Sequence, residues 1–286
     1  MASEPGAQID FTLRLIQPPL SAGLGQSVII DNRSSSGFIL AEMLLRAPAD
    51  GYTMLMQASS FWLAPLMQSA PYDMLKDFAP VMIGTNAPLF LYVHPSVPAK
   101  SVKELVALAK AKPGELNYGS AGSGATNYLA AELFKSMAGV NIVRIPYKGT
   151  AQAAVGLLAN QAQAMFGSAA AGFSHVKSGK LRVLAAATAQ PSALAPEVPT
   201  LAASGVPGFE AGSMSGVYVP IKTPGAVINR LNQEMVRVLA IADVKDKMIS
   251  AGIEPVGNTP AQALAYIKAD LVKWGKVIKD TGMKAE

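Results

Sequence analysis

The chain has no cysteine and only two histidines among its 286 residues. The lack of cysteine excludes disulfides, thiolate metal sites and cysteine nucleophiles, and it leaves the redox compartment open. His94 and His175 lack the spaced partners of a histidine metal site or of a catalytic triad. The isolated aspartates near turns form no acid–base pair. We therefore expect no metal, no cofactor and no catalytic residue.

Charge is also scarce: Asp, Glu, Lys and Arg make up only 15% of the residues, whereas hydrophobic residues make up 50%. This composition predicts a large buried core and little disorder. The net charge of +5 would concentrate anionic ligands, although a charge of this size also serves solubility. The basic residues form no run and no stripe interleaved with aromatic residues, so we expect no nucleic-acid partner.

No apolar run reaches the ~20 residues that span a bilayer, so we expect that the chain itself is not membrane-spanning. The first four residues, Met1–Glu4, lack the charged n-region and the apolar h-region of a signal peptide. An exported mature chain and a cytoplasmic protein would both begin in this way.

Short apolar segments alternate with helical periods along the chain. This pattern predicts an α/β fold of mostly parallel sheets flanked by helices. Ser101 with Glu104, and Thr259 with Gln262, form capping boxes that predict two helix starts. The strand candidates are Ser27–Ile30, Thr53–Gln57, Leu89–His94, Leu116–Ser120, Ile142–Tyr147, Ala164–Ser168, Leu181–Thr188 and Gly216–Val219.

Prolines and glycines near residues 95–98 and 205–212 predict two crossings of the chain between lobes. We expect lobe 1 to comprise residues 1–97 together with 213–286, and lobe 2 to be the insertion 98–212. Two crossings would place a ligand cleft between the lobes.

The sharpest local feature is the small-residue segment 117–128, which leads from a predicted strand into a predicted helix. Small residues let backbone N–H groups approach a ligand, and the helix N-terminus adds unpaired donors and a positive dipole end. Ser120, Ser123 and Thr126 add hydroxyl donors. The segment is therefore typical of an anion site, unless its glycines only permit a tight turn.

Sharper motifs do not fit this segment. A phosphate-binding P-loop needs Gly-Lys-Ser/Thr, but Gly124 is followed by Ala125. A dinucleotide fingerprint needs a third glycine where Asn127 stands. A hydrolase nucleophile elbow needs glycine two residues before and after its serine, which neither Ser120 nor Ser123 has.

Several stretches together resemble the periplasmic solute-binding proteins of tripartite tricarboxylate transporters, the Bug family, in order and spacing from about Leu24 to the C-terminus. The matching stretches are Ala47–Thr53 ("PDGYT"), Tyr72–Asp73 with Lys76–Phe78 ("YD…KDF"), Asn117–Ser120 with Gly122, Gly124 and Leu129–Phe134 ("NYGS.G.G…HLAAELF"), Ile145–Gly149 ("VPYKG") and Pro196–Thr200 ("PDVPT").

The resemblance implies a two-lobed Venus-flytrap fold, the periplasmic-binding-protein fold, with a carboxylate held in the cleft by backbone amides and hydroxyls of loops, without an arginine clamp. The implied ligand-binding positions are Ser120, Ala121, Gly122, Ser123, Gly124 and Thr126 in lobe 2, and Pro5, Gly6, Asp10, Ala58, Ser59 and Ser60 in lobe 1. Phe61, Tyr128, Tyr147, Gly167 and Ser168 complete the candidate site.

The sequence departs from the family near its start. The family normally begins with a strand such as "IRLIVPF" before a "PGG" loop, whereas only Met1–Glu4 precede Pro5. We expect lobe 1 to lack this parallel strand. The loop is altered at Pro5–Asp10, and the "NRPGAGG" element is altered at Asn32–Gly37.

Other departures bear on the ligand. Tyr128 stands where the family usually has histidine, and Gly156 and Gly167 stand where aspartates are common. Without these acids a ligand ammonium group would lack a partner. Phe61 and Trp62 either contact the ligand or are buried packing residues. We expect a di- or tricarboxylate or an aromatic carboxylate without an amino group.

The resemblance thus implies a protein of the periplasm that captures a small carboxylate for integral-membrane transporter subunits, and that works as a monomer. The same fold could instead serve as a ligand-sensing subunit of a signalling system. An enzyme acting in the cleft is a third alternative, although no nucleophile–base pair supports it.

Overall fold

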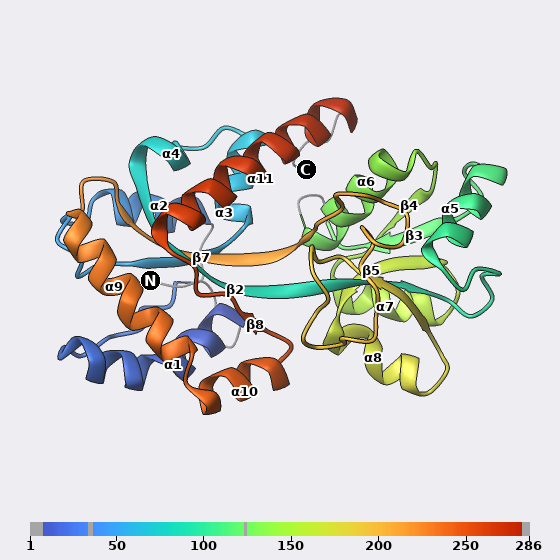
Figure 1. Ribbon diagram of the computed structural model, residues 1–286. Helices are drawn as coiled ribbons and strands as arrows, with labels where there is room; N and C mark the ends of the chain where they lie inside the picture. Colours follow the sequence, from blue (N-terminus) through green and yellow to red (C-terminus); the bar gives the residue numbers. More distant parts are fainter. Residues whose placement is uncertain (1–7, 34–36, 123–124, 282–286) are drawn as a thin grey trace. The chain divides into compact units, whose positions relative to one another are not determined.

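The computed structural model describes residues 8–33, 37–122 and 125–281 (Figure 1). Contacts divide the chain into two units. Unit 1 comprises Met1–Asn86 and Met214–Lys276, and unit 2 comprises Ala87–Ser213 and Val277–Glu286. The changeovers fall within β2, β7 and α11, and the lobe boundaries that the sequence suggested stay a prediction.

Unit 1 holds α1 (Gln8–Leu24), α2 (Gly37–Leu45), β1 (Leu55–Ala58), α3 (Ser60–Leu63), the 3-10 turn η1 (Ala64–Leu66), α4 (Met74–Asp77), the first part of β2 (Phe78–Val93), most of β7 (Gly212–Pro220), α9 (Gly225–Leu239), α10 (Ala242–Ser250), β8 (Glu254–Pro255) and most of α11 (Pro260–Thr281). Its sheet is antiparallel where β1 pairs with β7 and where β8 pairs with β2. Helices α1 and α9 lie side by side in Figure 1, and the Arg230 side chain of α9 donates to the Gly23 carbonyl of α1 over 2.8 Å.

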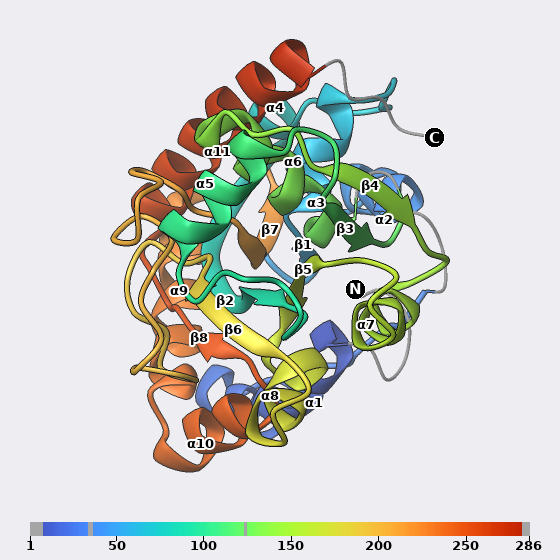
Figure 2. The same cartoon turned by 90° about the vertical axis from the view of Figure 1, so that its right-hand side faces the viewer.

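Unit 2 holds the second part of β2, α5 (Val102–Ala111), β3 (Asn117–Ser120), α6 (Thr126–Ala138), β4 (Val143–Pro146), α7 (Thr150–Leu158), β5 (Ala164–Ser168), α8 (Ala169–Lys177) and β6 (Arg182–Ala186). β3 runs parallel to β4 and β5, whereas β2 lies antiparallel between β5 and β6. Figure 2 shows β6 beside β2. Four strands of unit 2 thus point the same way, and β2, which continues from unit 1, points the other way.

The predicted helix starts are confirmed. The Ser101 hydroxyl accepts from the Glu104 N–H at 3.2 Å, and the Glu104 carboxylate accepts from the Lys100 N–H at 2.7 Å. At the start of α11, Thr259 Oγ1 accepts from the Gln262 N–H, and Gln262 Oε1 accepts from the Thr259 N–H. These bonds satisfy backbone donors at and just before each helix start, and the pair between Thr259 and Gln262 is reciprocal.

The expected strand at Ser27–Ile30 is wrong. No ladder pairs this segment among the described residues, and side chains of α1 hold it instead. Ser21 Oγ accepts from the Val28 N–H at 3.0 Å, and Gln17 Nε2 donates to the Val28 carbonyl at 2.7 Å. An apolar groove of about 950 Å³ is lined both by this segment and by Met54 and Met56 at β1. The segment is not a strand because the Val28 backbone bonds to side chains of α1 instead of to a ladder.

An aromatic cluster forms part of the unit 1 core. The Phe61 ring stacks on Tyr72 at 5.0 Å and packs against Phe78 and Tyr218 at 5.2 and 5.1 Å. Beside it, the fully buried Trp62 donates its indole N–H to an Asp270 carboxylate oxygen over 2.8 Å. The two aromatic residues that follow Ser60 are therefore packing residues of the core.

The Trp62–Asp270 bond should contribute measurably to stability. Trp62→Phe leaves a buried carboxylate without one of its donors, so we expect the free energy of unfolding to fall by ~1–3 kcal/mol, as measured by urea denaturation. In an Asp270→Ala background the same substitution should cost less, because the acceptor is already gone. An equal cost in both backgrounds would contradict this account.

Candidate functional site

The carboxyl ends of three parallel strands meet at one edge of the unit 2 sheet. In the β3–β4 register Ser120 pairs with Pro146, and β5 pairs in parallel on the other side of β3. Helices α6, α7 and α8 begin directly beyond these strands. Ligands of α/β folds bind preferentially outside the carboxyl ends of parallel strands, so this edge is the first candidate for a binding site.

The three helix starts leave donors at this edge. Their N-cap residues are Ala125, Gly149 and Ser168, and none of these three described residues makes a side-chain cap hydrogen bond. The first N–H groups of a helix have no intrahelical acceptor, and the helix dipole is positive at this end. The edge can therefore accept an anion.

The predicted small-residue loop lies at this edge. Ser120 ends β3 and is completely buried, and its carbonyl accepts from the Tyr147 N–H over 2.9 Å. Gly122 is exposed, and its carbonyl accepts from the Ala125 N–H over 3.0 Å, just before Thr126 begins α6. The predicted residues Ser123 and Gly124 lie outside the described residues.

An arginine that the sequence reasoning missed holds this loop. Arg144 Nε donates to Ser120 Oγ over 3.0 Å, and an Arg144 terminal nitrogen donates to the Ala121 carbonyl over 2.9 Å. The guanidinium carbon lies 4.3 Å from the centroid of the Tyr128 ring, in cation–π geometry. Ser120, Ala121 and Tyr128 were all predicted site residues, and Arg144 contacts all three. A signal was available in the sequence, because Arg144 directly precedes the Ile145–Gly149 motif.

Beneath the loop, a polar contact ties α6 to β3. The Tyr118 hydroxyl donates to a Glu132 carboxylate oxygen over 2.5 Å, and Lys135 Nζ donates to the same oxygen over 2.8 Å. Burial raises the pKa of the Tyr118 hydroxyl far above its usual range, and the bond to Glu132 adds to this shift. Tyr118 is therefore protonated at physiological pH. Its hydroxyl donates the hydrogen bond that holds α6 against β3.

Gly167 and Ser168 lie at the end of β5, at the same edge. A Cβ atom added to Gly167 would approach the Met165 methyl carbon to 2.6 Å, so the Met165 side chain would have to move to admit a larger residue here. The Ser168 carbonyl accepts from the Tyr92 hydroxyl over 3.1 Å. Close packing against Met165 thus favours glycine at position 167, and glycine also leaves this position without an acidic side chain.

Close packing against Tyr147 likewise favours glycine at position 156. The Tyr147 hydroxyl donates to Gln161 Oε1 over 3.4 Å, and its ring lies against α7. A Cβ atom added to Gly156 would collide with the Tyr147 ring and hydroxyl. The aromatic side chain therefore occupies the space that a side chain at position 156 would need.

The predicted residues of unit 1 are placed differently from the expected loop. Asp10 lies in the first turn of α1, is 4% exposed, and pairs with Arg14 at 3.0 Å. Ala58 ends β1 and Ser59 is buried, while Ser60 is exposed at the start of α3. Pro5 and Gly6 lie outside the described residues.

Two of these residues have local roles in the structure. Asp10 is a helical residue with an ion-pair partner rather than part of a loop, because an acidic residue in the first turn and an arginine four residues later both favour a helix. Phe61 is enclosed by other aromatic rings and is only 2% exposed, so it packs in the core. Ligand binding by Asp10 and Phe61 stays a prediction.

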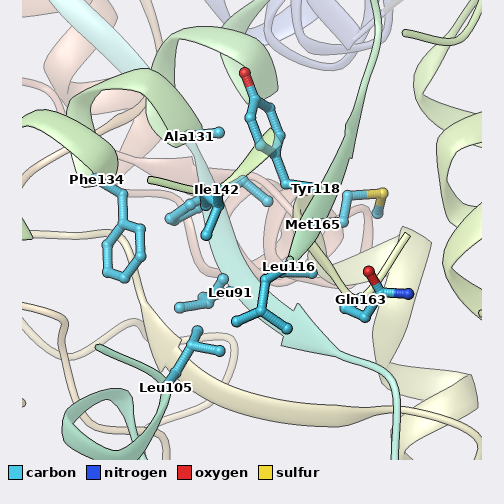
Figure 3. Close-up of a pocket in the computed structure, with 11 residues that line it drawn as sticks. Leu91, Leu105, Leu116, Tyr118, Ala131, Phe134, Ile142, Gln163 and Met165 are labelled. Atoms are coloured by element: carbon cyan, nitrogen blue, oxygen red, sulfur yellow. The ribbon is translucent and has the colours of Figure 1, made fainter. Parts of the chain in front are cut away.

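A small enclosed space in unit 2 is not a ligand site. Figure 3 shows Leu91, Leu105 and Leu116 facing a small cavity, with the hydroxyl of Tyr118 pointing away from them. The cavity has about 10 Å³ of free space, which is room for about one water molecule. It is a packing gap in an apolar core.

Comparison with known proteins decides the family. A family model described as the tripartite tricarboxylate transporter family receptor matches residues 12–283. The chain belongs to this family. Among its relatives is BugT of Bordetella pertussis, which is 34% identical over 98% of this chain and 87% of BugT.

Solved structures agree with this assignment. The structure of Rpa4515 from R. palustris with adipate has a TM-score of 0.78 and 33% identity, covering 100% of this chain and 97% of Rpa4515. MatC from Rhodopseudomonas palustris with bound malate has a TM-score of 0.72 and 25% identity, with 97% of both chains covered. The predicted Bug-family relationship and periplasmic-binding-protein fold are thereby confirmed.

Family membership makes this chain a solute-binding protein. Among the described residues, no helix combines the length and apolarity that a bilayer crossing needs. The prediction that the protein is not an enzyme stays a prediction.

The Tyr147–Gly156 contact can be tested by a double-mutant cycle. Gly156→Ala should destabilise this receptor by ~1–3 kcal/mol, because the new methyl group displaces Tyr147. In a Tyr147→Ala background the same substitution should instead stabilise the protein by ~0.5–1 kcal/mol, because alanine favours a helix over glycine. Urea denaturation measures both effects, and the same sign in both backgrounds would refute the contact.

Proposed function

We propose that this receptor binds a small carboxylate at the carboxyl edge of β3, β4 and β5. The observation that carries the proposal is the meeting of three uncapped helix starts beside the Ser120–Gly122 loop. Backbone N–H groups with fixed directions suit a carboxylate, and each helix contributes the positive end of its dipole. The hydroxyls of Ser120, Thr126 and Ser168 add further donors at the same edge.

The charges at this edge favour a plain carboxylate over an amino acid. The segments 120–128, 144–150 and 167–172 contain Arg144 and Lys148 but no Asp or Glu. A ligand ammonium group would lose its water without gaining a carboxylate partner there. We therefore propose a dicarboxylate without an amino group, within the wider class of di-, tri- and aromatic carboxylates.

The relatives support this ligand class. One solved relative holds adipate and another holds malate, and both ligands are dicarboxylates without an amino group. Binding by Ala58, Ser59 and Ser60 of unit 1 remains a prediction.

We further propose that the receptor works as a monomer in the periplasm and delivers its ligand to integral-membrane transporter subunits. Its membership in a family of transporter receptors supports this role. A binding protein of this kind needs no chemistry of its own, because its task is complete when the membrane subunits accept the ligand.

A ligand panel tests the proposed function. Adipate, malate, citrate, benzoate and glutamate would be compared by thermal shift and then by calorimetry. We expect a plain dicarboxylate to bind most tightly and, at a hundredfold excess over its Kd, to stabilise the protein by ~2.7 kcal/mol. Tighter binding of glutamate would contradict the charge argument, no shift with any acid would contradict carboxylate binding, and turnover of a ligand would contradict a pure binding role.

The start of α6 offers a matched pair of variants. Thr126→Val keeps the shape of the side chain but removes its hydroxyl, so we expect it to weaken binding by ~1–3 kcal/mol if a charged ligand loses a donor. Thr126→Ser keeps the hydroxyl and should stay close to the wild type. If calorimetry gives both variants wild-type affinity, the hydroxyl of Thr126 is not part of the site.

A further inference from the structure

Arg144 reaches from β4 to the Ser120 loop, and its contacts there include two oxygen atoms of described residues. It donates from Nε to Ser120 Oγ at 3.0 Å and from a terminal nitrogen to the Ala121 carbonyl at 2.9 Å. The Tyr128 ring supports the guanidinium on one face. Together these contacts give the guanidinium a fixed position.

The direction of the bond to Ser120 determines what the serine can do. An arginine side chain has only donors, so Ser120 Oγ must act as the acceptor. The hydroxyl hydrogen of Ser120 is therefore left to point elsewhere, and among the described residues no hydrogen bond uses it. A hydroxyl that accepts from a cation also becomes a stronger donor, because hydrogen bonds in series polarise one another.

We propose that Arg144 is a positioning residue of the carboxylate site, and that it acts through Ser120 by directing the hydroxyl of that serine toward the ligand. The inference rests on the proposed function, and it deepens that function by naming how the loop is prepared for its ligand. The ligand carboxylate would then accept from a serine whose oxygen is already held by a guanidinium. Tyr128, where the family usually has histidine, supplies the flat surface that keeps the guanidinium in place.

A double-mutant cycle at positions 120 and 144 tests the proposed action of Arg144 through Ser120, which we call the relay. The probe is adipate or malate, whichever binds the wild-type protein more tightly in calorimetry. We expect Ser120→Ala and Arg144→Met each to raise the Kd by about 10- to 100-fold. The Kd of the double variant should lie within about threefold of the higher of the two single-variant values, because both substitutions remove the same interaction. Effects that multiply in the double variant, or an Arg144→Met variant with wild-type affinity, would overturn the relay.

Tyr128 provides the matched control. Tyr128→Phe keeps the ring, so it should bind the probe more tightly than Tyr128→Leu, which removes the support of the guanidinium. Arg144→Lys keeps the charge without the planar fork, so it should fall between Arg144→Met and the wild type. Equal affinities for Tyr128→Phe and Tyr128→Leu would exclude the ring from the relay, and full wild-type affinity for Arg144→Lys would show that charge alone suffices.

A measurement without ligand separates the two proposals. The Arg144 Nε–H resonance should be protected from exchange in the wild-type protein and should shift in Ser120→Ala. If neither dicarboxylate binds, the proposed function fails while this spectrum still tests the contact. If a dicarboxylate binds but the resonance is unchanged by Ser120→Ala, the relay fails and the proposed function stands.

Discussion

At the end of the β3–β4 ladder, the Tyr147 amide donates to the Ser120 carbonyl over 2.9 Å. Because β3, β4 and β5 run in parallel, their carboxyl ends and the helices that follow them must lie at the same edge. The strand pairing therefore determines where the loop, the three helix starts and Arg144 lie. A reversed β4 would turn Arg144 and the start of α7 away from Ser120.

The features predictable from the sequence are those with a local cause. The capping boxes at Ser101 and Thr259 involve residues three positions apart, and the structure contains both. The small-residue loop likewise carries its chemistry within one short segment. The α/β class follows from alternating periods along the chain, so it too needs no knowledge of distant contacts.

The features that sequence reasoning missed depend on partners far along the chain. Ser27–Ile30 has the composition of a strand, but a strand also needs a neighbour. Arg144 lies 24 positions from Ser120, and only the β3–β4 register brings them together. Phe61 follows a predicted contact serine, yet rings from Tyr72 and Tyr218 enclose it. Composition at one position cannot reveal such packing.

The contact between Tyr147 and Gly156 restricts the order in which this protein can change. An aspartate introduced at 156 would meet the Tyr147 side chain before it could meet a ligand. Position 147 must therefore become smaller first, and that first step alone would open a void without providing an acid. An acidic side chain that extends past Tyr147 from position 156 thus needs two substitutions. The packing of Tyr147 on α7 therefore limits which side chains position 156 can acquire by a single substitution.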